Sequence, residues 1–205
     1  MQFCVTTYVT QNVILPEDLI PKLGEWGYDG IELWGGRPYQ VGRLKWGLEG
    51  RTQTELEQLK KLVEEQGLEV PVVSPYFKFT SGEEDYKNSL QKAKRYCELA
   101  KFYSAKVIRV LGEGIPSAKM TEDNWKAFIR GLKDLAALGN EYGVVFGLEL
   151  HPDTPHDTVL GQLRCIWQTG SPKVRALYQP STTSELEPEI DPLWALEMLY
   201  SYIRP

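Results

Sequence analysis

The sequence predicts an α/β protein of the parallel β/α barrel type, with six of the eight strand–helix units that close such a barrel. Short β-rich runs alternate with longer segments of helical period, a pattern that requires crossover connections and a parallel sheet. No glycine-rich phosphate loop follows the first expected strand, which argues against an open dinucleotide-binding sheet. A full barrel takes about 250 residues, and this chain has 205. We expect a single barrel domain over residues 1–205 that lacks the last two units.

The six expected strands follow one another along the chain at residues 3–8, 30–34, 69–74, 106–111, 144–150 and 175–179. Each precedes a segment in which apolar residues recur at spacings of three and four, as in Leu56, Leu59, Leu62 and Val63, or in Trp125, Phe128, Ile129, Leu132, Leu135 and Ala136. Such stripes would cover the outer face of the sheet.

Local signals mark the ends of several helices. Thr54 with Glu57 is typical of a capping box, and Gly67 stands where a helix stop is expected. Asp191 followed by Pro192 indicates the start of the last helix. Residues 35–51 are too long for a tight turn, so they form either a loop over a site or an ordinary surface excursion.

Composition excludes several classes of protein. The net charge of −5 and pI near 5.2, with Lys and Arg scattered among Asp and Glu, provide no basic patch for nucleic acid. Three distant cysteines, Cys4, Cys97 and Cys165, favour reduced and mostly buried thiols over disulfides or a zinc site. The chain shows no signal-peptide pattern and no run approaching about 18 apolar residues. We therefore expect a cytoplasmic protein without membrane partners.

Strand alternation predicts which side chains face the barrel interior. In strand 30–34, Ile31 and Leu33 suit the helix layer, which turns Glu32 and Trp34 inward. In strand 144–150, the apolar positions Phe146, Leu148 and Leu150 suit the helices. This leaves Glu149 and His151 on the inner face near the C-terminal end of the strand, where the active sites of such barrels lie.

The same alternation sends Arg109 inward, and Gln179 as well if Tyr178 packs outward. Ser74 and Tyr76 follow on the third strand. Buried carboxylates need partners, so a Glu32–Arg109 ion pair is one structural interpretation.

Two further ionisable residues lie in loops. We interpret His156 as a solvated loop histidine and Glu113 as an acid in an exposed loop.

The chain resembles the xylose isomerase-like barrel superfamily, which includes sugar isomerases, sugar epimerases, hydroxypyruvate isomerase, inosose dehydratase and endonuclease IV enzymes. The resemblance covers nearly the whole sequence and is carried by GEWGYDGIELWG, KVIRVLG, FGLELHP and VRALYQPS in that order. In these enzymes a Glu at the end of strand five and an Asp at the end of strand six bind a divalent metal, with a His and a Glu from strands seven and eight.

Glu149 matches the first of those ligands, whereas the second position holds Gln179, an amide without charge. The positions of the other two would come after Pro205. The resemblance implies an isomerase or epimerase of a small sugar or sugar acid, with Mn, Mg or Zn assisting proton transfer. Glu149 and His151 would be catalytic, and Glu149 and Gln179 would be the metal ligands.

The remaining roles are binding roles. Tyr8, Trp34, Tyr76 and Arg109 would bind the substrate. The alternative function is an inactive, shortened barrel that serves as a sugar-binding or structural module. An endonuclease would need a histidine-rich zinc site, and this chain has two histidines.

The unpaired edges of the first and sixth strands raise the question of what covers them. We expect a homo-oligomer that covers this opening, or a piece of a longer enzyme. Closure by six strands alone has no support in the sequence.

Overall fold

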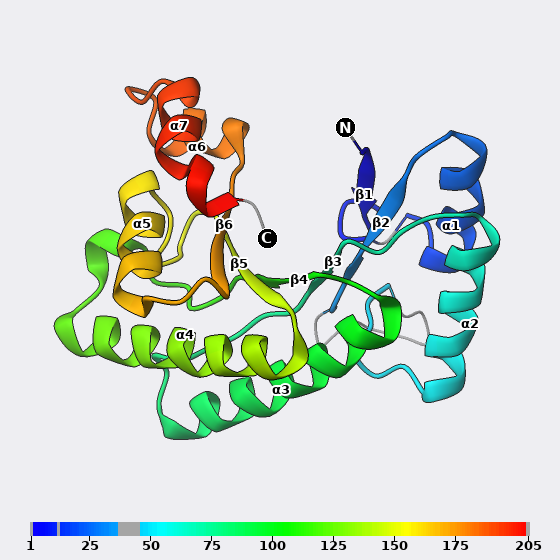
Figure 1. Cartoon of the computed structure of the whole chain (residues 1–205), viewed down its shortest axis with the longest axis horizontal. Coiled ribbons are helices and arrows are strands. Elements are labelled where there is room, and N and C mark those ends of the chain that lie inside the picture. Colours follow the sequence, from blue (N-terminus) through cyan, green and yellow to red (C-terminus); the bar gives the residue numbers. More distant parts are fainter. Residues whose placement is uncertain (1, 12, 37–45, 204–205) are drawn as a thin grey trace.

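The computed structural model describes residues 2–11, 13–36 and 46–203. Six parallel strands form one sheet in the order β1-β2-β3-β4-β5-β6, so that each strand pairs with its neighbour in sequence. Helices connect the strands and lie along the outer side of the sheet (Figure 1). The prediction of a parallel α/β barrel with six strand–helix units is confirmed.

The strands are β1 (Cys4–Thr6), β2 (Gly30–Trp34), β3 (Val72–Ser74), β4 (Val107–Val110), β5 (Val145–Glu149) and β6 (Val174–Leu177). The helices are α1 (Pro16–Glu25), α2 (Gln53–Glu65), α3 (Glu83–Tyr103), the short η1 (Ser117–Lys119), α4 (Glu122–Tyr142), α5 (Val159–Thr169), α6 (Pro180–Leu186) and α7 (Pro192–Ile203).

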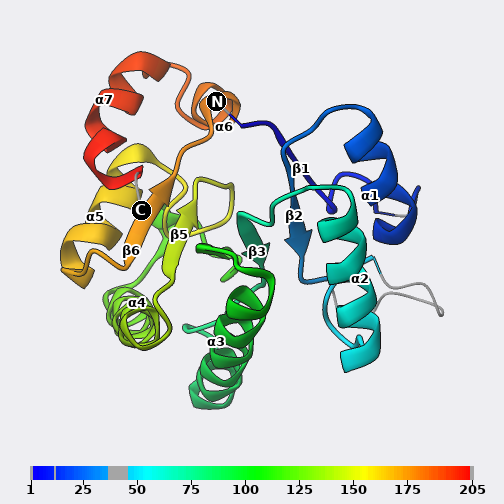
Figure 2. The same cartoon turned by 45° about the vertical axis from the view of Figure 1, so that its right-hand side comes forward.

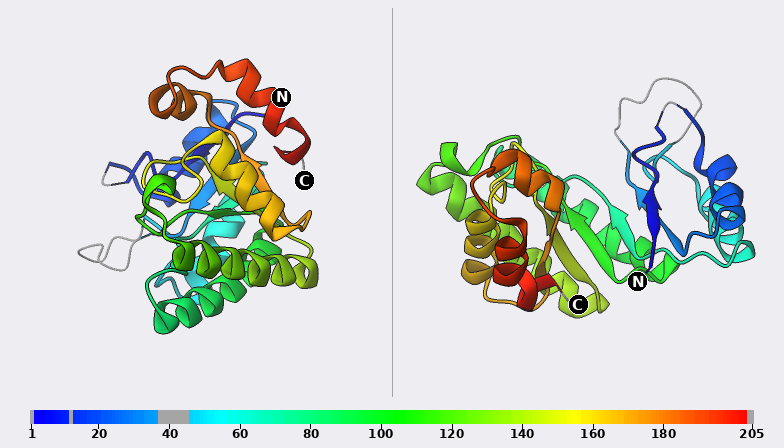
Figure 3. Two further views of the ribbon diagram at one scale, coloured as in Figure 1. Left: turned by 90° about the vertical axis from the view of Figure 1, so that its left-hand side faces the viewer. Right: turned by 90° about the horizontal axis from the view of Figure 1, so that it is seen from above.

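The sheet is curved and open. Its strands bend around a common interior while α1 to α5 surround them (Figure 2). Seen from above, β1 and β6 lie on opposite sides of the opening (Figure 3, right). Within the described ranges these two strands form the edges of the sheet, each with a neighbouring strand on one side only.

The side-chain alternation of the strands follows the prediction. Ile31 and Leu33 of β2 and Phe146 and Leu148 of β5 are fully buried in the hydrophobic core under the helices. The strand register agrees with this alternation. Arg109 of β4 pairs with Gly147 of β5, and both positions belong to the inner face. A Cβ atom at Gly147 would lie 2.6 Å from Leu177 Cγ, so the glycine makes room for that side chain.

Five of the six strands differ from their expected ranges at one or both ends, and β2 alone matches. For β3 and β6 a proline explains the difference. The third strand covers only Val72–Ser74, because Pro71 has no N–H for the sheet ladder, although Glu69 forms an isolated bridge with Gly30. The sixth strand begins at Val174 and ends at Leu177, since Pro180 starts α6 with Gln179 as its N-cap.

The capping box of α2 lies two residues earlier than expected, at Thr52 and Glu55. Thr52 has an extended backbone and its hydroxyl accepts from the Glu55 N–H, whereas Thr54 is already helical. The other two helix signals are confirmed. Gly67 adopts a φ of +65° just past α2, and Asp191 Oδ1 accepts from Leu193 N at 2.7 Å.

All three cysteines are free thiols; Cys97 and Cys165 are buried and Cys4 is exposed. In the described ranges no helix combines the length and apolar character that crossing a membrane requires. The loop expected over a site at residues 35–51 lies partly outside the described residues, at 37–45.

Candidate functional site

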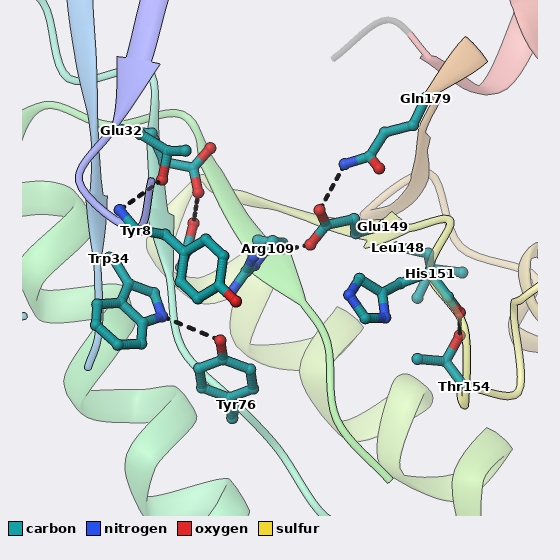
Figure 4. A network of polar contacts seen from close by, with 12 residues as sticks. Tyr8, Glu32, Trp34, Tyr76, Arg109, Leu148, Glu149, His151, Thr154 and Gln179 are labelled. Atoms are coloured by element: carbon teal, nitrogen blue, oxygen red, sulfur yellow. Dashed lines mark hydrogen bonds and ion pairs between the residues drawn. The ribbon is translucent and has the colours of Figure 1, made fainter. Parts of the chain in front are cut away.

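A polar cluster forms where β4, β5 and β6 end, on the inner face of the sheet (Figure 4). Arg109 Nη1 donates to Glu149 Oε2 at 2.8 Å, and Gln179 Nε2 donates to Glu149 Oε1 at 2.5 Å. The Glu149 side chain is 12 % exposed and the Arg109 side chain 8 %. Three residues that strand alternation predicted to face the interior therefore lie together, with Glu149 bonded to both Arg109 and Gln179.

Arg109 has donors to spare. Its Nε and Nη2 atoms are buried without a hydrogen-bond partner among the described residues, and its guanidinium lies 5.3 Å from the centre of the Tyr76 ring. A buried donor without an acceptor is unfavourable, and a guanidinium matches carboxylate oxygens in a two-pronged arrangement. This part of the site suits an anionic oxygen.

The expected Glu32–Arg109 ion pair is wrong, because Arg109 binds Glu149 instead. The Glu32 carboxylate accepts the Ser74 hydroxyl. Burial raises the pKa of Glu32 above its ordinary value, and the nearby charge of Arg109 acts against that rise. The two inward acids thus differ in their partners: a hydroxyl for Glu32, and a cation with an amide for Glu149.

Three aromatic rings lie across the interior from Glu149 (Figure 4). Tyr8 packs edge-on against Trp34 with ring centres 5.2 Å apart, and Trp34 Nε1 donates to the Tyr76 hydroxyl at 3.1 Å. Trp34 is fully buried, whereas Tyr8 is exposed. Tyr8 and Tyr76 can therefore form a wall, and Trp34 supports both rings.

His151 follows β5 and is exposed. Its Nδ1 lies 2.8 Å from the backbone carbonyl of Pro152. A carbonyl oxygen only accepts, so Nδ1 carries the hydrogen, and Nε2 of the neutral ring keeps its lone pair. His151 thus presents a basic nitrogen on the same side of the sheet as Glu149 (Figure 4).

A cleft of about 570 Å³ adjoins this site and is lined in part by Tyr76, Glu113 and His151. The interpretation of Glu113 as an acid in an exposed loop is wrong. Its carboxylate accepts the backbone N–H groups of Phe79 at 2.5 Å and Thr80 at 3.1 Å, and burial raises its pKa. Gly112 and Gly114 flank Glu113 and adopt positive φ angles. This pair of glycines was the sequence signal for a tightly folded loop at Glu113.

The interpretation of His156 as a solvated loop histidine is also wrong. The side chain is 1 % exposed and its ring stacks on Phe128. Burial lowers its pKa to about 4. The loop sequence between β5 and α5 has no period, so nothing in it indicated that one of its residues is turned into the protein.

The described side chains do not fit a divalent metal as they stand. Among those residues no group of three or more His, Cys, Asp and Glu side chains converges. Both oxygens of Glu149 already hold donors, and the Gln179 carbonyl oxygen accepts from Thr182 Oγ1 at 2.8 Å. Metal ligation by Glu149 and Gln179 stays a prediction.

These features define a parallel β/α barrel protein with its candidate site at the carboxyl ends of the strands. The chain belongs to the xylose isomerase-like TIM barrel family, whose model matches residues 20–203. Over 158 residues it is 23% identical to a 3-dehydroshikimate dehydratase of Bacillus anthracis. That alignment covers 77% of this chain and 54% of the relative, so the chain spans about half the length of the protein it matches.

Solved structures support the same fold. The probable 3-DHS dehydratase of Bacillus anthracis superposes with a TM-score of 0.84 at 20% identity, covering 100% of this chain and 71% of the other. D-Psicose 3-epimerase of Clostridium cellulolyticum H10 gives 0.78 at 15% identity, with 99% and 71% covered. A xylose isomerase-like barrel protein of Mycobacterium smegmatis in complex with magnesium gives 0.76 at 15% identity, with 98% and 72% covered.

Proposed function

We propose that this protein is an isomerase or epimerase of a small sugar or sugar acid, which moves a proton at a carbon next to a carbonyl group. The observation that carries the proposal is the pair of buried Arg109 donors that have no partner within the described part of the chain, next to the ion-paired Glu149. Those donors suit a substrate carboxylate, or an oxygen that becomes negative during reaction. Tyr8 and Tyr76 offer aromatic faces for the sugar ring.

The chemical step is assigned to His151 and Glu149, with His151 as the base and Glu149 as the residue that orients Arg109 and the substrate. His151 Nε2 removes a proton from the carbon beside the carbonyl, which leaves an enediolate whose oxygen is bound by Arg109. Glu149 holds Arg109 in place and orients a neighbouring hydroxyl. An epimer forms when water delivers a proton to the opposite face and the imidazolium of His151 loses its proton to solvent. An isomer forms when His151 returns its proton to the neighbouring carbon and a proton shifts between the two oxygens.

Dehydration is the second candidate, and it is supported by the likeness to the 3-dehydroshikimate dehydratase. Proton removal next to a carbonyl is the first step of this reaction as well. The intermediate then expels a hydroxyl from the next carbon as water instead of regaining its proton. Product analysis separates the two reactions.

A divalent ion, Mn, Mg or Zn, remains part of the proposal. Its support is the magnesium complex among the structural neighbours. Binding to Glu149 would require Arg109 to leave that carboxylate, together with ligands beyond those described. Titration calorimetry with each metal tests this point directly.

The experiment that tests the function is hydrogen exchange in D₂O. Ketoses, sugar acids and 3-dehydroshikimate are incubated with the protein, and proton NMR detects deuterium at the carbon next to the carbonyl. Enzyme-dependent exchange that is abolished in Glu149→Gln supports the proposal. Binding without exchange would point to the sugar-binding module, and exchange that persists in Glu149→Gln would contradict the assignment of Glu149.

We also propose a homo-oligomer that covers the opening between β1 and β6, in the cytoplasm. Support comes from the edges of β1 and β6, which have no further strand partner among the described residues, and from two exposed apolar side chains. Phe3, which precedes β1, is 59% exposed, and Trp194, on the helix α7 that packs against β6, is 41% exposed. Light scattering on the purified protein measures the mass, and a monomer at micromolar concentration would contradict the proposal.

A further inference from the structure

His156 lies in the loop between β5 and α5, two residues before Thr158, the N-cap of α5. Its ring is stacked on Phe128 of α4, with ring centres 6.0 Å apart and an angle of 26° between the planes. Because the ring is shielded from water, its polar atoms must be satisfied by the protein.

The contacts of His156 lead to His151, the proposed base. Nδ1 of His156 lies 3.3 Å from Thr154 Oγ1. Thr154 Oγ1 in turn donates to the backbone carbonyl of His151 at 2.7 Å, so Nδ1 of His156 carries the hydrogen in this contact. One buried imidazole is therefore connected to His151 through a single hydroxyl.

The β5–α5 loop requires contacts that hold its conformation. It is neither strand nor helix from Leu150 to Asp157, and Asp153 within it has a left-handed φ of +57°. A residue other than glycine is disfavoured in that region and persists only where its surroundings hold it. The His156 and Thr154 bonds are contacts that hold it here.

We propose that His156 is a positioning residue, which fixes the β5–α5 loop so that the side chain of His151 faces the same site as Glu149. The inference rests on the proposed function, since it gives a purpose to the direction of those two side chains. His156 itself is buried beneath the loop and takes no part in the reaction.

The two histidines of the chain make the test direct. ¹⁵N-histidine NMR reports which ring nitrogen of His151 carries hydrogen. In the wild type we expect one neutral tautomer, with hydrogen on Nδ1. His156→Phe keeps the stacking on Phe128 but removes the hydrogen bond to Thr154, and His151 should then show a mixture of tautomers. In the exchange assay kcat should fall about tenfold or more while KM changes little, and His156→Asn, which retains a donor, should recover part of the loss.

Tyr103→Phe is the matched control. It removes a buried hydrogen bond to the Leu56 carbonyl, in α2, and should leave the His151 spectrum unchanged. The inference is overturned if His156→Phe folds cooperatively and its His151 tautomer is that of the wild type. If His156→Phe does not fold, Thr154→Val removes only the hydroxyl bridge and must give the same mixture. A wild type without exchange activity would refute the proposed function, and the NMR result would still decide the role of His156.

Discussion

Arg109 on β4 and Glu149 on β5 form an ion pair with 2.8 Å between Nη1 and Oε2, and the pair is almost completely shielded from solvent. Neither side chain is satisfied by this contact alone. Glu149 takes a second donor from Gln179, while two nitrogen atoms of Arg109 remain without a partner among the described residues. In this pair the Glu149 carboxylate is held by two donors, whereas the Arg109 guanidinium is still able to bind another oxygen.

Arg109→Met tests this asymmetry. Removal of the guanidinium leaves Glu149 as a buried charge with only the Gln179 amide, so the free energy of unfolding should fall by about 3 kcal/mol at neutral pH. In the same variant, binding of sugar acids should weaken more than binding of neutral sugars. Urea denaturation and calorimetric titration measure the two effects.

The double variant Arg109→Met with Glu149→Gln supplies the control, because it removes both charges and should recover most of the lost stability. Arg95→Met, at an exposed ion pair with Glu98, should leave the urea midpoint unchanged. A stable Arg109→Met protein would show that Glu149 does not depend on the pair.

Gln179→Asp should increase manganese affinity. The variant places a second carboxylate beside Glu149 at the position where the family resemblance implies a metal ligand. Without metal the two like charges should lower the melting temperature, and manganese should restore it. Thermal unfolding with and without millimolar manganese measures this, with Gln179→Asn as the neutral control. If the wild type responds to manganese as strongly as the variant, the Arg109–Glu149 pair does not hinder a metal.

The inner face of the site was predictable because strands have a period of two. Alternation with Phe146 and Leu148 was enough to turn Glu149 inward. The partner of Arg109 was not predictable in the same way. Glu32 and Glu149 both face the interior, and only the register and curvature of the sheet bring Glu149 within reach of the guanidinium.

Loop residues were harder to place, since their conformation depends on tertiary contacts that leave no period in the sequence. Burial of Glu113 follows from N–H groups of the β3–α3 loop, which lie more than 30 residues away in the chain. The cap of α2 was missed by two residues because Thr52 and Thr54 are equally suitable in type, and the backbone entry angle decides between them.

Gly147→Ala should destabilise the barrel through one contact. The new Cβ would lie 2.6 Å from Cγ of Leu177, and the lumen has to accept a displaced leucine, which costs about 1–3 kcal/mol. The second change Leu177→Ala should offset part of this loss, so the two substitutions should not be additive. Urea denaturation of the four proteins in the cycle measures the coupling. Additive effects would mean that Gly147 is needed for another reason.

Because of His156, the free energy of unfolding should decrease as the pH is lowered from about 6.5 to about 4. Burial holds its pKa near 4 in the folded state, whereas the unfolded chain has the ordinary value of 6.5. In this window the unfolded state binds more protons than the folded state. The stabilisation that His156 contributes is therefore complete above pH 6.5 and decreases as the pH falls. The difference between the two pKa values corresponds to roughly 3 kcal/mol of unfolding free energy. The raised pKa values of Glu32 and Glu113 act in the opposite direction, so the total curve is a sum.

His156→Phe isolates the histidine contribution, because it leaves those carboxylates in place. The difference in unfolding free energy between wild type and variant, measured by urea denaturation from pH 4 to pH 8, should be flat above pH 6.5 and should change by the amount stated above as the pH falls. A difference that does not vary with pH would mean that His156 takes up a proton equally in both states. Its ring would then be accessible to water, which would also remove the physical basis for its role in holding the loop.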